Sequence, residues 1–168
     1  MMNTLGYIAN VVIPAAYCIL PKTMSTPEAS AMLLAIGLQE SKFEYRRQIK
    51  GPALSFWQAE SGGGFRGLLT HHETRAIARE VLAVMAYGEP DASDFQAIED
   101  NDILACCGAR LLLWTHPKPL PTHNEQDYAW QYYIETWRPG RPHPQTWPEC
   151  FRKAWEAVNH QSPFGRSQ

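Results

Sequence analysis

The spacing of hydrophobic and polar positions predicts helices along most of the chain, and segment 26–40 is the most apolar of them. Thr26 followed by Pro27 is a helix-start signal, and the residues after them are apolar on almost every side. A helix without a polar face is expected at the centre of a domain, covered by its neighbours. Polar Gln39 and Glu40 come at its C-terminal end.

Apolar residues recur at helical spacing through much of the remaining chain. Capping boxes are expected where Ser93 precedes Gln96 and where Thr146 precedes Glu149. The further helices predicted in this way cover 74–87, a short stretch from Ser93, 101–114, 124–137 and 146–160.

The N-terminal stretch 3–20 is apolar as well. It lacks a basic start, contains Asn10 and Pro14, and is short for a bilayer span. We therefore expect a helix packed in the core or docked on a partner, with no membrane span. The glycine-rich stretch 51–67 is predicted to be a loop with room for a small β-hairpin.

These patterns predict an all-α fold, α+β at most, because no strong alternating pattern typical of strands is present. No internal repeat or low-complexity linker divides the chain. We expect a single domain over 1–168, made of the N-terminal helix 3–20, a core over 26–137 that carries the chemistry, and a C-terminal helix 146–160.

Composition narrows the function classes. With 168 residues, 45% hydrophobic and 19% charged, the chain can bury a substantial core. A net charge of −2 argues against nucleic acid as a partner. The four cysteines form no C-x-x-C pair and are expected to be buried thiols, and the run of residues 71–73, His-His-Glu, lacks a third ligand at zinc spacing.

Glu40 is the strongest candidate for chemistry. Apolar surroundings and the negative end of a helix both disfavour ionisation of a carboxyl group. A carboxyl that keeps its proton near neutral pH can protonate the departing oxygen of a glycosidic bond. Taken alone, however, Glu40 is better explained as the point where the helix meets water.

Two short motifs favour the catalytic interpretation of Glu40 over that of a plain helix end. Residues 39–43 read Gln-Glu-Ser-Lys-Phe and resemble the Glu-Ser-x-Phe motif of lytic transglycosylases and goose-type lysozymes. Residues 51–58 read Gly-Pro-Ala-Leu-Ser-Phe-Trp-Gln and are similar to the Gly-Ala-x-Gly-Leu-Met-Gln motif that follows in that superfamily. The order and separation also match, and the resemblance extends over about 26–137. Small phage and prophage lysozyme-like proteins are the most similar group.

The resemblance implies a lysozyme-like helical domain that cleaves the bond between N-acetylmuramic acid and N-acetylglucosamine in peptidoglycan. It implies that Glu40 is the general acid and that Gln58 faces the sugar. We further expect substrate contacts from the remaining candidates, which are Ser41, Phe56, Trp57, Tyr133 and Trp137. No cofactor or metal is needed for such chemistry, because it consists of proton transfer and stabilisation of an oxocarbenium-like state.

Two positions depart from the family pattern. Ser55 stands where a glycine usually allows close backbone approach. Residues 137–140 read Trp-Arg-Pro-Gly in the place of a Tyr-Asn-Ala-Gly motif. The indole of Trp137 cannot accept a hydrogen bond, so support for the acid is expected to be lost or to come from one of three nearby tyrosines, Tyr128, Tyr132 and Tyr133.

Glu60 is a possible second carboxylate. If it faces Glu40 across a water-sized gap, an inverting hydrolase results. If it only caps the glycine-rich turn, Glu40 acts as both acid and base, the substrate's N-acetyl group assists, and a 1,6-anhydro sugar is released. We favour the second route. Arg46, Arg47 and Arg66 are candidates for binding peptide-stem carboxylates or lipid-anchored anionic polymers, although simple surface solvation explains each of them better.

A second function class also fits the sequence. The chain could be a non-catalytic virion or tail protein that binds cell wall or other virion proteins through a lysozyme-like scaffold, because fold alone does not decide function. In either case we expect synthesis in the bacterial host cytoplasm without a signal peptide. The protein would then reach the wall by release at lysis or as part of the phage virion.

Overall fold

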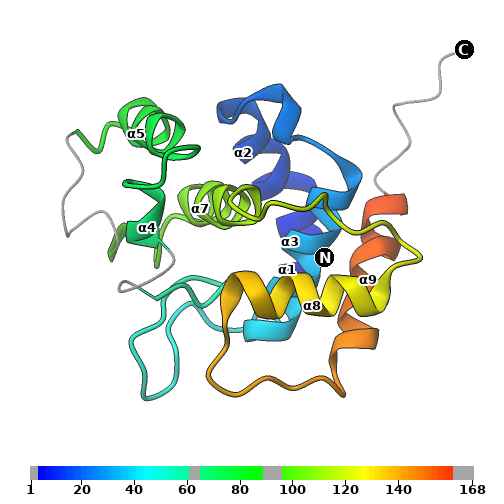
Figure 1. Cartoon of the computed structure of the whole chain (residues 1–168). Helices are drawn as coiled ribbons and strands as arrows, with labels where there is room; N and C mark the ends of the chain where they lie inside the picture. The colour runs from blue at the N-terminus through cyan, green and yellow to red at the C-terminus, as the bar shows by residue number, and fades with distance from the viewer. Residues whose placement is uncertain (1–3, 61–64, 89–95, 161–168) are drawn as a thin grey trace, which may run out of the picture.

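The structure is a computed structural model that describes residues 4–60, 65–88 and 96–160 (Figure 1). The described chain is helical, and its only bridges between extended segments are two isolated pairs, Arg47 with Leu54 and Leu54 with Ala59. The all-α prediction is confirmed, and the small hairpin expected in the middle of the chain is reduced to these bridges within the described residues.

The helix predicted to be central is the centre of the core. Helix α3 (Pro27–Ser41) begins as expected, with the Thr26 hydroxyl accepting a hydrogen bond of 3.1 Å from the Ala29 amide. Its residues from Ala29 to Gly37 are all buried, which is why the sequence shows no polar face there. Figure 1 shows α3 between α7 (Asp102–Trp114) and α9 (Trp147–His160), and both helices contact it.

The N-terminal stretch is a core helix, as predicted. It consists of α1 (Thr4–Tyr7), a π-helical turn η1 (Ile8–Val12) and α2 (Ile13–Ile19), followed by the short η2 (Lys22–Met24). Its buried face carries Ile8, Val12 and Ala16. No helix among the described residues is long and apolar enough to cross a membrane.

The later helices follow the predicted pattern with small changes at their ends. Helix α7 is capped by Asn101, whose side chain accepts from the Leu104 amide at 3.0 Å. The helix expected from Ser93 begins outside the described residues. The remaining helices are α4 (Arg66–Leu68), α5 (Arg75–Val84) and α8 (Gln126–Trp137).

Two local predictions are wrong. The Thr146 hydroxyl does not form the expected capping box with Glu149, because it lies 2.9 Å from Gln39 Oε1 while Glu149 pairs with Arg152. The four cysteines are free, but only Cys106 and Cys107 are buried. Cys18 is exposed on the outer side of α2 and Cys150 is half-buried on α9.

A close contact fixes the end of the central helix. A Cβ atom added at Gly37 would lie 2.2 Å from the ring of Phe43, which is buried and packs edge-on against Phe56 and Trp57. The ring cannot move aside without disturbing those neighbours. Position 37 therefore requires glycine even though glycine disfavours helices.

We expect Gly37→Ala to destabilise the protein by about 1–3 kcal/mol, because overpacking outweighs the better helix propensity of alanine. Gly67→Ala is the matched control, since nothing lies within 4 Å of the added Cβ there. Urea unfolding at neutral pH measures both. Equal midpoints for the two variants would show that the contact does not constrain the helix.

Candidate active site

The run of residues 39–43 forms a tight reversal at the end of α3. Lys42 and Phe43 both have left-handed backbone angles, with φ of 54° and 56°. Ser41 is fully buried beneath the turn, and its hydroxyl donates to the Phe56 carbonyl at 2.7 Å while accepting from the Phe43 amide at 3.1 Å. With Ser41 and Phe43 directed inward, Glu40 is left on the side that faces a cavity.

The second motif is held against the same helix. The Trp57 indole donates to the Leu33 carbonyl at 2.8 Å, in the middle of α3. Ser55, with φ of 68°, uses the left-handed conformation that explains why a glycine suits this position, and its hydroxyl accepts from the Trp57 amide at 3.2 Å. Gln58 is also left-handed, with φ of 48°, and its side-chain amide donates to the Ser55 carbonyl at 2.7 Å.

Trp137 joins this assembly from α8. Its indole donates to the Trp57 carbonyl at 2.9 Å, so the residue that replaces a tyrosine of the family pattern holds the motif of residues 51–58 in place. Support for the acid comes from Tyr133, one helical turn earlier. The other two tyrosines considered bind elsewhere, with Tyr128 donating to Pro119 and Tyr132 to Leu113.

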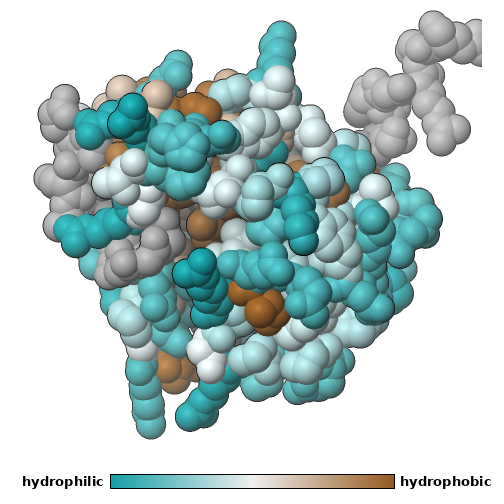
Figure 2. All heavy atoms as spheres, viewed as in Figure 1, coloured by the Kyte–Doolittle hydropathy of each residue, from teal (hydrophilic) through white to brown (hydrophobic). Residues whose placement is uncertain are grey.

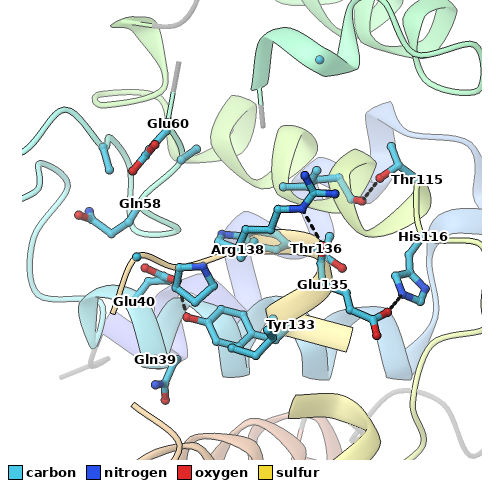
Figure 3. Close-up of a pocket in the computed structure, with 18 of the residues that line it drawn as sticks. Gln39, Glu40, Gln58, Glu60, Thr115, His116, Tyr133, Glu135, Thr136 and Arg138 are labelled. Atoms are coloured by element: carbon cyan, nitrogen blue, oxygen red, sulfur yellow. Dashed lines mark hydrogen bonds and ion pairs between the residues drawn. The ribbon is translucent and has the colours of Figure 1, made fainter. Parts of the chain in front are cut away.

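The cavity beside Glu40 has a volume of about 1340 Å³. It lies between the 45–60 segment, the end of α8 and the loops that follow α7 and α8, on a face that Figure 2 shows to be mostly hydrophilic. The predicted site residues that line it are Glu40, Gln58, Glu60, Tyr133 and Trp137. In Figure 3, Glu60 stands apart from Glu40 on the other side of Gln58.

Three predicted substrate contacts are not at this cavity. Ser41, Phe56 and Trp57 are each no more than 2% exposed and do not line it. The expectation that the two aromatic rings face the sugar is therefore wrong in this structure. Their apolar surface and the indole N–H are used instead to attach the motif to α3. These buried residues support the site by holding the 55–58 turn against α3.

Burial controls the acidity of Glu40. Desolvation raises its pKa from 4.5 to about 7, the hydrogen bond from Tyr133 opposes this shift, and the charge of Glu60 adds to it. The Tyr133 hydroxyl donates to Glu40 Oε1 at 2.6 Å (Figure 3). Burial raises the pKa of Tyr133 far above its usual value, so Tyr133 stays a donor, and its ring stacks on Trp147 at 5.1 Å.

Glu40 forms no ion pair with an arginine among the described residues. The arginines near it in sequence have other partners. Arg46 makes a two-pronged contact with Asp102, with both distances 2.8 Å, and Arg47 pairs with Glu99. Arg66 is exposed and does not line the cavity. The three arginines considered for binding stem carboxylates therefore lie outside the site.

Several other residues that line the cavity were not predicted from the sequence. His116 and Glu135 meet at 2.8 Å on the cavity wall, and the Lys118 amide donates to His116 Nδ1 at 3.2 Å. With Nδ1 accepting from this amide, Nε2 is the nitrogen that donates to Glu135, and this hydrogen bond lowers the pKa of Glu135. Tyr45, whose hydroxyl lies 3.4 Å from the Glu40 carbonyl, lines the cavity as well. No spacing motif connects these residues, because Tyr45 follows α3, His116 follows α7 and Glu135 lies in α8.

Comparison of the chain with protein-family models, curated proteins and solved structures finds no significant match. The resemblance to lytic transglycosylases therefore stays a prediction. Within the described residues, no group of three or more histidine, cysteine or acidic side chains is placed to hold a metal ion.

The raised pKa of Glu40 makes the stability of the protein depend on pH. Because the folded state binds this proton more tightly than the unfolded state, its contribution is fully present below pH 4.5, declines between pH 4.5 and 7, and is lost above pH 7. Glu40→Gln keeps an acceptor for Tyr133 and removes the buried charge. We expect the variant to be more stable than the original protein by about 2–3 kcal/mol at pH 8, and about equal to it at pH 4.

Thermal unfolding from pH 4 to 8 measures this difference. The exposed Glu44→Gln is the control and should follow the original protein at every pH. A Glu40→Gln advantage that does not change with pH would show that Glu40 does not hold a proton in the folded state.

Proposed function

We propose that this protein cleaves the glycan strands of peptidoglycan at the bond between N-acetylmuramic acid and N-acetylglucosamine. The observation that carries the proposal is the state of Glu40, a carboxyl with a pKa of about 7 on the wall of an open cavity, held by a tyrosine hydroxyl. A protonated carboxyl in such a place suits general acid catalysis of glycoside cleavage.

In the proposed reaction Glu40 donates its proton to the glycosidic oxygen as the bond to the anomeric carbon breaks. The charge that develops on the sugar resembles an oxocarbenium ion. Tyr133, which donates to Oε1, stabilises the carboxylate that remains after proton transfer. The oxygen of water or of the sugar's own hydroxyl then bonds to the anomeric carbon and gives up its proton. When Glu40 accepts that proton, the acid is restored.

Whether the reaction ends in hydrolysis or in a 1,6-anhydro product depends on the role of Glu60. This side chain is exposed, lines the same cavity and acts on Glu40 through its charge. As a base that activates water, it would give hydrolysis. With Glu40 as the only working carboxyl, attack by the sugar's hydroxyl would give a 1,6-anhydro product. We favour this second route, and Gln58 and Tyr45 supply polar groups that can hold the strand.

Activity should depend strongly on Glu40. We expect Glu40→Gln to reduce clearing of purified peptidoglycan by about 10²–10⁴-fold, because glutamine cannot donate the proton. A turbidity assay on isolated cell walls measures this, with Glu44→Gln as the control that keeps activity. Failure of the original protein to clear walls while it still binds them would favour the wall-binding virion scaffold instead.

Glu60→Gln separates the two routes. If Glu40 works alone, we expect activity to be retained and the alkaline limb of the pH profile to move to lower pH, because removal of the Glu60 charge lowers the pKa of Glu40. Initial rates from pH 4 to 9 measure the shift, and mass spectrometry of the products shows whether anhydro ends form. Loss of activity in the variant across the whole pH range, together with products of the original protein that lack anhydro ends, would assign the base to Glu60.

A further inference from the structure

Three cationic side chains line the cavity that contains Glu40. Lys118 belongs to the segment after α7, and Arg138 and Arg141 to the segment after α8. All three are exposed, and none forms an ion pair with a carboxylate among the described residues. Their situation differs from that of Arg46 and Arg47, whose guanidinium groups are engaged by acidic side chains.

Arg138 has a defined position at the end of α8. Arg138 ends α8 in the left-handed conformation, with φ of 49°, and its Nε donates to the Glu135 carbonyl at 3.3 Å. Figure 3 shows its side chain extending from the end of α8 across the pocket in the direction of Thr115, which also lines it. Arg138 therefore presents its terminal nitrogens to whatever occupies the cavity.

The segment that carries Arg141 is attached directly beside Glu40. The Gln39 side-chain amide donates to the His143 carbonyl at 3.0 Å, and its oxygen lies 2.9 Å from the Thr146 hydroxyl. Pro139, Pro142 and Pro144 further restrict this segment. Because Gln39 precedes Glu40 in α3, it is a positioning residue that attaches the segment carrying Arg141 to the end of the helix that carries the acid.

The balance of charge in the cavity favours an anion. When Glu40 holds its proton, the acidic groups left in the described lining are Glu60 and Glu135, and Glu135 is already engaged by His116. The three cations then outnumber them. Cations grouped on a cavity wall attract anionic ligands, and the attraction weakens with salt.

We propose that Arg138 and Arg141, assisted by Lys118, bind carboxylate groups on the glycan and make the protein select acidic strands over neutral ones. This inference rests on the proposed function and adds a substrate preference to it. The carboxylate can be the lactyl group of a muramic acid without a peptide or an acid of the stem peptide, since both offer the same planar anion to a guanidinium fork.

Binding is best measured in Glu40→Gln protein, which should not cleave the strand. Four soluble probes are compared by calorimetry. The first two are acidic: glycan strands that carry peptide stems, and glycan strands from which the stems have been removed. The last two are neutral: stem-bearing strands whose carboxylates have been converted to methylamides, and N-acetylglucosamine oligomers. We expect Arg138→Gln with Arg141→Gln to weaken binding of the first two probes by about 10-fold and to leave the last two unchanged. Loss with only one acidic probe identifies which carboxylate is bound.

Arg75→Gln is the matched control, because Arg75 is exposed on α5 and outside the cavity lining. Equal weakening on neutral and acidic probes, or no weakening at all, would overturn the charge preference while wall clearing by the original protein still supports the proposed function. If the original protein clears no wall and Glu40→Gln protein binds none of the four probes, the proposed function and this inference both fail.

Discussion

The attachment of the 55–58 turn to the middle of α3 is the contact on which the site depends. Two hydrogen bonds make it, from Ser41 to the Phe56 carbonyl and from Trp57 to the Leu33 carbonyl. A third, from Trp137 to the Trp57 carbonyl, attaches the same turn to α8. All involve groups that are wholly or partly buried, where an unpaired donor or acceptor is costly. These hydrogen bonds join α3, which carries Glu40, to the 55–58 turn and to α8.

Two opposing effects set the proton affinity of Glu40. Burial favours the neutral carboxyl, whereas the hydrogen bond from Tyr133 favours the carboxylate. Burial is the larger effect, so the pKa reaches about 7 rather than falling below its usual value. A group poised there can both give and regain a proton near neutral pH, which is the requirement for an acid that must also act as a base.

Much of the helical framework could be predicted from the sequence, because helix patterns are local. The apolar run of residues 31–38 placed α3 at the centre, and Thr26 and Asn101 marked helix starts that the structure confirms. The capping box at Thr146 was wrong because a distant partner, Gln39, engages the hydroxyl. Local spacing carries no information about a residue more than a hundred positions away.

The candidate site was predictable only in part for the same reason. Glu40 could be found because it ends an apolar helix and also stands in the first of two short motifs that follow each other at the expected separation. Phe56 and Trp57 were misplaced because an aromatic residue beside a polar motif has the same pattern whether it faces a ligand or the core. The pair of His116 and Glu135 had no signal, since only folding brings the ends of α7 and α8 together.

Four residues around the site, Lys42, Phe43, Ser55 and Gln58, have left-handed backbone angles although none is glycine. Each such residue costs on the order of 1 kcal/mol relative to an ordinary conformation. The molecule thus concentrates conformational strain in the two turns that flank its acid. Engineering for heat resistance would naturally begin with glycine or asparagine at these positions, and there the gain in robustness would compete with the rigidity that holds Glu40 and Gln58 in place.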